Sequence, residues 1–392
     1  MDTQNTPIHL RLWHRGFWFL TFASMMLSMA ATIVQPIVPL WMVQESQLRP
    51  FDAAVVILSF CVGLWLFGSM NSYLTQRFRR HHVFQVAVFM TQLCLLILYL
   101  IVNYLPTYIT TLLPVISLCY GACWGLAQIV LCSTLIIDVC ESFQRTEANH
   151  ATAWFRRFSL SLGPVIGLVL YFYFGFTSVL IASALASCLA IVFVGLVAFP
   201  FKAPDDNLRL FSCDRFLLYN GHLLIFTLLL IAAVFGLLIA TVTNPYFFSV
   251  LMVGFLLALI AEKIAFANAH IESENITGLL ALGTALLLMI TRDVAIIHHI
   301  VPVLIGFGFG IIASRFMLFF IKMSHHCQRG TSQSTYMLTC TTGICFGIAG
   351  GYILLQGYSL LMIQYVALSL TIISLLLYHF ITHPWYMKNK NR

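Results

Sequence analysis

The chain has 392 residues, of which 60% are hydrophobic and only 8% are charged, with a formal net charge of +7. So few charges cannot cover the surface of a water-soluble protein of this length, which excludes a soluble globular enzyme. Lipid forces backbone polar groups into internal hydrogen bonds, so membrane-spanning helices or a closed barrel remain. The apolar runs have roughly the 20 residues of a membrane-spanning helix, and barrel alternation is absent. We therefore expect an all-helical membrane protein.

Twelve apolar runs predict twelve transmembrane helices. The first is too long for the core of a signal peptide, and we expect it to be retained. The longest polar stretch falls at the midpoint of the chain, which predicts an N-terminal six-helix bundle (1–199), a central linker (200–222) and a C-terminal six-helix bundle (223–392). The expected spans are 16–43, 53–74, 83–103, 108–137, 152–173, 176–199, 223–242, 246–263, 276–291, 295–321, 335–355 and 359–382.

The basic residues follow these spans. If both termini lie in the cytoplasm, seventeen Lys and Arg residues fall in inner segments, and only Arg49 and Arg292 fall in outer ones. Loops that stay in the cytoplasm carry such an excess. We therefore expect both termini in the cytoplasm, most simply of a bacterial inner membrane. The positive charge indicates inner loops and not a nucleic-acid partner.

One set of motifs occurs twice, at an offset of 184 or 185 residues. A membrane chain made of two similar halves is typical of a transporter, because the halves form a cleft that can open to either side. Glycines spaced four apart allow close helix contact, and Pro164 adds a kink, so we expect these positions to be packing sites. The first copy is Gly121-x3-Gly125, Gln144-Arg145 and Gly163-Pro164-x2-Gly167; the second is Gly306-x3-Gly310, Gln328-Arg329 and Gly347-x3-Gly351.

Several segments resemble those of the major facilitator superfamily. Gly68 followed by a basic cluster that begins at Arg77 resembles its loop between helices two and three, although Ser72 and Thr75 replace an aspartate and a glycine. The alternative is a glycine beside ordinary inner arginines. The Gly163-Pro164 motif resembles the fifth helix of exporters in that superfamily. The layout of the whole chain is also similar.

The resemblance implies a fold, a function and a cavity. The fold would be twelve helices in two pseudo-symmetric six-helix bundles. The function would be movement of a small organic solute by alternating access, with efflux implied by the exporter motif. We expect a monomer without cofactor or metal, and a binding cavity lined by spans one, four, seven and ten.

The loop after span four carries charges that form a gate in the superfamily. The resemblance implies Asp138, Arg145 and Arg157 as gating residues, together with Gly68, Arg77 and the repeated Arg329. The alternative is solvated loop charges, because an exposed ion pair contributes only ~0–1 kcal/mol.

Arg315 is the only Lys or Arg placed well within an expected span. A cation at the bilayer centre costs at least ~2.5 kcal/mol unless it is paired or hydrated. Arg315 could bind an anionic substrate group, pair with Glu262, or extend to the inner interface. All three interpretations stay open.

Span four offers Tyr120, Trp124 and Gln128 at helical spacing, which suits a ligand with polar and apolar parts. Ordinary helix packing is the alternative. In symmetric halves Gln128 and Arg315 would point about 160° apart, and we favour Arg315 for the cavity. Gln35 in span one either contacts the ligand or bonds a neighbouring helix.

Three questions stay open at this stage. No Asp or Glu lies deep in an expected span, so a coupling proton, another coupling or none are alternatives. An integral membrane enzyme acting on a lipid-linked substrate is a second hypothesis, although the outer loops are too short for an active site. A transport-inactive scaffold or sensor is a third.

Overall fold

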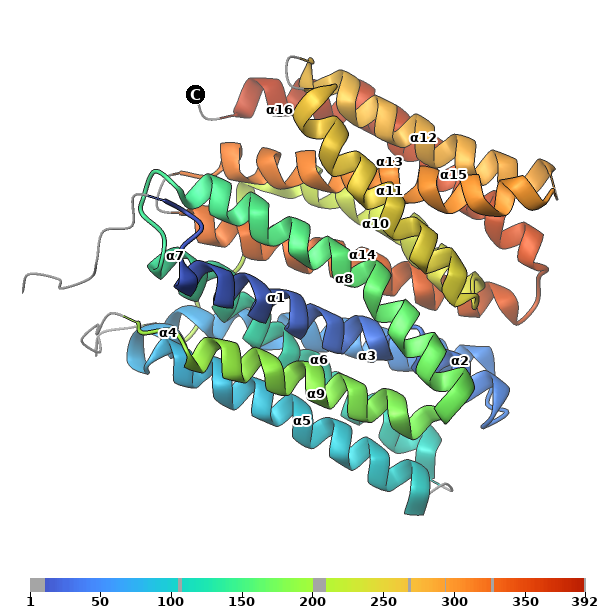
Figure 1. The fold of residues 1–392 in the computed structure, drawn as a ribbon, viewed down its shortest axis with the longest axis horizontal. Coiled ribbons are helices and arrows are strands. Elements are labelled where there is room, and N and C mark those ends of the chain that lie inside the picture. Colours follow the sequence, from blue (N-terminus) through green and yellow to red (C-terminus); the bar gives the residue numbers. More distant parts are fainter. Residues whose placement is uncertain are drawn as a thin grey trace, which may run out of the picture.

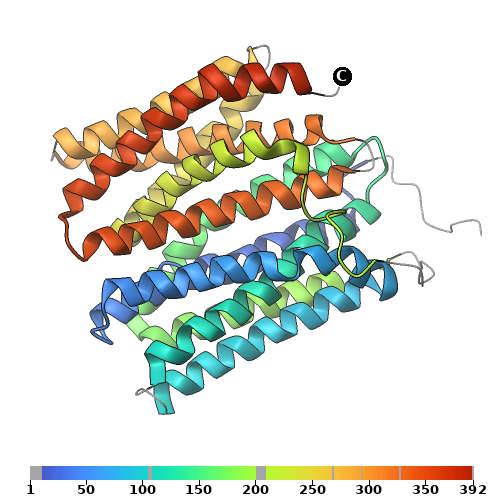
Figure 2. The same cartoon turned by 180° about the vertical axis from the view of Figure 1, so that it is seen from behind.

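The computed structural model describes residues 11–104, 108–199, 209–266, 269–292, 294–325 and 328–390. Its regular structure is helical throughout these ranges, and twelve helices are long and apolar enough to cross a membrane. The predicted all-helical fold with twelve spans is confirmed for the part of the chain that is described. Figures 1 and 2 show the helices running roughly side by side.

The first half contains spans one to six. The first span is broken at Pro36, because proline lacks the N–H that would continue the helix. The helices are α1 (Arg15–Val34), α2 (Ile37–Gln44), α3 (Pro50–Leu66), η1 (Gly68–Met70), α4 (Asn71–Arg77), α5 (Arg80–Tyr104), α6 (Ile109–Val130), the π-helical η3 (Leu131–Leu135), α7 (Ile136–Asp138), α8 (Arg145–Phe174) and α9 (Phe176–Gly195).

The second half contains spans seven to twelve. Its helices are η4 (Tyr219–Gly221), α10 (His222–Thr241), α11 (Pro245–Ile264), α12 (Ile271–Thr291), α13 (Ala295–Met323), α14 (Arg329–Leu355), α15 (Leu360–Leu377), the π-helical η6 (Tyr378–Thr382) and α16 (His383–Asn389).

The two halves form two bundles that meet along two pairs of helices. Helix α3 packs along α14, and α8 packs along α11. The blue and green helices of the first half lie below the orange and red helices of the second in Figure 1, with α8 and α14 near the boundary. The same face of each half therefore builds the interface, which is the arrangement expected of a pseudo-twofold repeat.

The two ends of the bundle differ in their connections. We call the end where the first span begins, the last span ends and the two halves are joined the basic end (left in Figure 1, right in Figure 2). We call the other the short-loop end. There α8 passes directly into α9 through Gly175, whose φ of +80° is a conformation that favours glycine.

The repeated glycines lie where helices approach most closely. A methyl group at Gly163 or Gly167 of α8 would collide with α1, at Thr32 and at the carbonyl of Ile33. Methyl groups at Gly347 and Gly351 of α14 would collide with α10 in the same way. Pro164 lies inside α8, between the two glycines. The repeat therefore marks equivalent helix contacts in the two halves.

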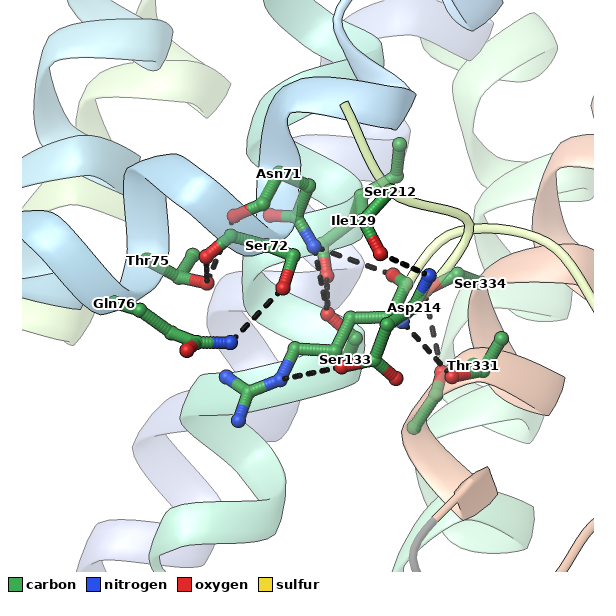
Figure 3. A network of polar contacts seen from close by, with 12 residues as sticks. Asn71, Ser72, Thr75, Gln76, Ile129, Ser133, Ser212, Asp214, Thr331 and Ser334 are labelled. Carbon is green, nitrogen blue, oxygen red and sulfur yellow. Dashed lines mark hydrogen bonds and ion pairs between the residues drawn. The ribbon is translucent and has the colours of Figure 1, made fainter. Parts of the chain in front are cut away.

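The connection between the halves packs against both of them. The Asn71 side chain donates to the Arg215 carbonyl at 3.2 Å, and the Arg215 backbone N–H donates to Thr331 Oγ1 at 3.0 Å (Figure 3). A methyl group at Gly68 would collide with the Phe216 ring, so the absence of a side chain at Gly68 allows the connection to pack here. Burial lowers the pKa of Arg215 from its ordinary value, and nearby Arg80 adds to this. Of the expected linker, residues 200–208 lie outside the described residues.

Three helices begin at least five residues earlier than their apolar runs predict. Helix α8 begins at Arg145 instead of 152, α12 at Ile271 instead of 276, and α14 at Arg329 instead of 335. A hydropathy pattern ends where polar residues begin, but a helix can continue through them. Arg156 and Arg157 therefore lie about 16 Å beyond the start of α8 at 1.5 Å per residue. The expectation that Arg315 is the only cation well within a span is wrong.

Candidate functional site

A narrow cavity of about 60 Å³ lies between the two halves. Spans one, four, five and eleven line it, whereas spans seven and ten, which the resemblance also implies, do not line this cavity. Known binding pockets for small molecules are several times larger, about 300–1,000 Å³. A solute can therefore enter only if the halves separate. The lining residues are Ser28, Ala31, Thr32, Gln35, Trp124, Ala153, Arg156, Arg157, Ser159, Leu160, Tyr336, Met337, Cys340, Thr341 and Ile344. We call this space the central cavity.

Two consecutive arginines of α8 supply its charge. Arg156 is 8% exposed and Arg157 is 3% exposed. One nitrogen of Arg156 donates to the Cys132 thiol at 3.3 Å. None of the three guanidinium nitrogens of Arg157 forms a hydrogen bond of normal geometry. Its Cζ lies 4.3 Å from the centre of the Trp154 ring, and the Tyr336 hydroxyl lies beside it. In the described ranges, no carboxylate forms an ion pair with either arginine.

The aromatic and amide candidates divide into two groups. Trp124 and Gln35 line the central cavity, and the Gln35 side-chain nitrogen has no hydrogen-bond partner. Gln128 is fully buried and donates to Ser28 Oγ at 3.0 Å, so it supports a cavity residue from behind. Tyr120 is buried and does not line the cavity. Of the span-four candidates, the structure brings only Trp124 to the cavity.

Arg315 lies in a different place. It lines a pocket of about 420 Å³ at the basic end, which we call the end pocket. Its guanidinium forms an ion pair with Glu274 of α12, and one nitrogen lies 3.9 Å from Glu262. Of the three interpretations of Arg315, the structure shows a pair, with Glu274 as the closer partner. Sequence reasoning missed Glu274 because the expected span begins at 276, whereas α12 begins at Ile271 and includes Glu274.

Glu262 of α11 joins the two halves beside this pocket. From α8 of the first half, His150 Nε2 lies 3.0 Å from Oε1, and Trp154 Nε1 donates to Oε2 at 3.2 Å. From α13 of the second half, Ser314 Oγ lies 2.8 Å from both carboxylate oxygens. We call these contacts the Glu262 junction. No sequence pattern points to His150 or Trp154, because their contacts with Glu262 cross between the halves.

The other gating candidates contribute unequally to the contact between halves. Asp138 pairs with Arg80, within the first half. Arg77 is exposed at the end of α4, and the Arg145 Nε has no hydrogen-bond partner. Arg329 does cross: it donates to the Ser142 carbonyl at 3.4 Å, and its own carbonyl accepts from Asn149 at 3.4 Å.

Burial also changes the acidity of the thiol of Cys140, which precedes α8 at the basic end. Burial raises the pKa of its thiol to about 12, so it stays protonated near neutral pH. Among the described residues, no three His, Cys, Asp or Glu side chains form a group that could hold a metal ion.

No protein-family model matches this chain, and no curated protein matches it. Solved structures match it over nearly its whole length. The human organic anion transporter MFSD10 (TETRAN) aligns with a TM-score of 0.68 at 12% identity, covering 93% of this chain and 98% of that one. The POT family transporter PepTSo aligns with a TM-score of 0.71 at 11% identity, covering 97% and 100%.

The chain has the major facilitator fold. A third similar structure is a bacterial homologue of the iron transporter ferroportin in its outward-facing state, with a TM-score of 0.63, 14% identity and coverage of 97% and 100%. The predicted fold class is thereby confirmed. Within the major facilitator fold the central cavity lies between the two bundles, and the Glu262 junction lies nearer the basic end.

Proposed function

We propose that this chain is a transporter that moves a small organic anion across a membrane by alternating access. The Arg157 guanidinium binds the anionic group in the central cavity. One observation carries the proposal: Arg157 is buried in the cavity lining, and none of its guanidinium nitrogens forms a hydrogen bond of normal geometry. A buried cation is costly unless it is paired, and a bound anion would supply the missing partner.

The surrounding side chains favour an anion with a compact apolar part. A guanidinium matches carboxylate and phosphate geometry through paired hydrogen bonds. Arg156 adds a second positive charge beside it, and Gln35 adds an amide nitrogen with no partner. Trp124, Met337 and Ile344 provide apolar wall. This set fits an aromatic or branched carboxylate, sulfonate or phosphate ester, and Arg157 takes the role considered for Arg315.

The similar structures support transport in general. They are described as transporters of organic anions, peptides, nucleosides and iron. The fold is therefore compatible with several substrate classes and does not choose among them. The buried arginines favour the anion, and no feature of this chain favours the enzyme or scaffold hypotheses.

We further propose that the basic end faces the cytoplasm of a bacterial inner membrane, because basic loops stay on that side. Residues 1–199 and 223–392 would move as two bodies about the central connection. One chain lines the whole cavity, which is compatible with a monomer. Neither direction of transport nor proton coupling is part of this proposal.

A binding screen on purified protein tests the substrate class. Benzoate, benzenesulfonate and phenyl phosphate are compared with benzamide and benzylamine, which share the ring but are neutral or cationic. A ligand that binds only the folded state raises its stability by about 2.7 kcal/mol at a hundred times Kd. We expect the melting temperature to rise with at least one anion and with neither benzamide nor benzylamine.

Two variants assign the binding to a site. Arg157→Gln should abolish the shift caused by the anion. The double variant Arg315→Gln with Glu274→Gln, which removes both charges of the pair in the end pocket, should retain it. A shift that survives Arg157→Gln and disappears in the double variant would place the anion at Arg315 and contradict the proposal. So would stabilisation by benzylamine alone.

A further inference from the structure

Trp154 has one partner at the face of its indole ring and another at its ring nitrogen. The ring face lies against Arg157, with the guanidinium carbon 4.3 Å from the ring centre. The ring nitrogen donates a hydrogen bond to Glu262 Oε2 at 3.2 Å. Trp154 itself is only 3% exposed. One rigid side chain therefore contacts a central-cavity residue and the Glu262 junction at once.

The two contacts belong to different parts of the proposed cycle. Arg157 lines the central cavity, where the substrate would bind. Glu262 lies on α11, and its bonds to Trp154 and His150 of α8 hold the second half against the first. Breaking these bonds is a requirement for the halves to separate at the basic end.

A cation on the face of an indole strengthens the hydrogen bond that the indole donates. The positive charge withdraws electron density from the ring, so the N–H becomes a better donor to a carboxylate. When an anion binds Arg157, it neutralises that charge and draws the guanidinium towards the cavity. The indole then loses its cation and holds Glu262 less strongly.

We propose that Trp154 is a positioning residue that transmits occupancy of the central cavity to the Glu262 junction. The anion would loosen the closure at the basic end from inside the cavity, without touching the closure itself. The direction of the signal rests on the proposed function, because it assumes an anion at Arg157. The energetic coupling between Arg157 and Glu262 through Trp154 does not, and it can be measured without any ligand.

A double-mutant cycle on the ligand-free protein measures this coupling. Spin labels are introduced as non-canonical amino acids at Phe143 and Ile264, which are exposed at the basic end of the two halves, so that the native cysteines stay in place. Double electron–electron resonance then gives the populations of closed and open basic ends. The variants are Arg157→Gln, Trp154→Phe and both together, all at one pH. The pH is fixed because titratable and charged groups surround Glu262, namely His150, Arg157, Lys263, Glu274, Arg315 and Lys322.

The expected result is non-additive. Arg157→Gln should raise the open-to-closed ratio roughly tenfold in the native background, within the range of coupling energies between contacting residues. In the Trp154→Phe background, where the ring remains but the N–H is lost, the same change should have less than about a twofold effect. If the two changes simply add, Arg157 acts on Glu262 through space or not at all, and the proposal is wrong.

A second cycle separates transmission from simple loosening. His150 also contacts Glu262, but in the described ranges no hydrogen bond or ion pair joins it to Arg157. His150→Leu should open the basic end as Trp154→Phe does, yet its effect should add to that of Arg157→Gln. Equal non-additivity in both cycles would contradict a specific role of Trp154.

An isosteric replacement of Trp154 distinguishes loss of the N–H from a general disturbance of the fold. Benzothienylalanine at position 154 keeps the shape of tryptophan and replaces the N–H with sulfur, so it should reproduce the Trp154→Phe result. Full coupling in this variant would overturn the proposal. A failed anion screen with a non-additive cycle would leave the coupling intact and reject only the substrate class.

Discussion

Arg157 of α8 and Thr341 of α14 occupy equivalent positions of the two halves and both line the central cavity. They are 184 residues apart, the same offset that separates Gly163 from Gly347. The preceding pair, Arg156 and Cys340, has the same offset and also lines the cavity.

The repeat therefore places a large cationic side chain on one side of the cavity and a small polar one on the other. The space opposite Arg157 is not filled by a symmetry-related arginine, whose charge would repel it. In the proposed function, this asymmetry between otherwise matching halves leaves space for one anionic group.

Replacing Arg157 should stabilise the ligand-free protein while removing its anion binding. Arg157→Met keeps most of the apolar length and removes a buried charge that forms no hydrogen bond of normal geometry. The desolvation cost exceeds the combined contribution of the Trp154 contact and of the Trp154–Glu262 bond that Arg157 strengthens, so we expect a net gain of about 1 kcal/mol. A rise of about 1–2 °C in melting temperature corresponds to this gain for a chain of 392 residues. A lower melting temperature would show that Arg157 is a structural residue.

Arg315 should behave in the opposite way. Arg315→Met leaves the buried Glu274 carboxylate without its partner, which costs about 3–5 kcal/mol. Adding Glu274→Met should recover most of this loss, because neither charge then remains. Melting curves of the two single variants and the double variant measure the effect. Equal stability of Arg315→Met and the native protein would refute the pairing.

One repeated glycine, Gly347, and the nearby Gly350, which is not part of the repeat, provide a matched pair on α14. Gly347→Ala should destabilise the protein by about 1–3 kcal/mol, because the new methyl group collides with the Ala233 carbonyl of α10. Gly350→Ala should be neutral or slightly stabilising, since nothing lies within 4 Å of its added methyl group. Thermal unfolding of both variants decides the matter, and the same outcome for both would contradict the close packing of α14 on α10.

Much of the fold follows from the sequence, whereas the site follows from it only in part. The length of the apolar runs and the placement of the basic residues predict the spans. The thickness of the bilayer determines the first, and the retention of basic loops in the cytoplasm determines the second. Hydropathy cannot show that α8 extends back to Arg145, so Arg156 and Arg157 fall at the start of the expected span 152–173 and are interpreted as inner-end charges, with Arg157 in a gate, and not as cavity residues. The repeat does contain a signal for their position. Its offset of 184 residues relates Arg156 and Arg157 to Cys340 and Thr341, which lie inside the expected span 335–355.

The contacts that cross between helices could not be derived from the sequence. The partner of Arg315 is Glu274, 41 positions earlier in the chain, and their pairing depends on how α12 packs on α13. The same holds for Trp154 and Glu262, which belong to different halves. Trp124, a candidate from its helical spacing with Tyr120 and Gln128, lines the central cavity, and its N–H donates to the Leu27 carbonyl of the first span at 2.9 Å.

The proposed orientation can be tested with cysteine labelling. Cys213 is exposed in the central connection at the basic end. In a variant that keeps only this cysteine, a membrane-impermeant maleimide should react from the cytoplasmic side, in inverted vesicles, and not in intact spheroplasts. A variant that keeps only Cys140 should stay unlabelled at neutral pH, because burial raises its pKa to about 12 and thiolate is the reactive form. Labelling of Cys213 in intact spheroplasts would show that the basic end faces the outside, which would contradict the proposed orientation.

The most direct test of the whole account is a density map of the protein bound to the anion that gives the largest shift in the binding screen. We predict that its carboxylate, sulfonate or phosphate group lies within hydrogen-bonding distance of the Arg157 guanidinium, with the apolar part towards Trp124. A map that shows the anion beside Arg315 in the end pocket, or an empty cavity with the anion bound elsewhere, would contradict the account.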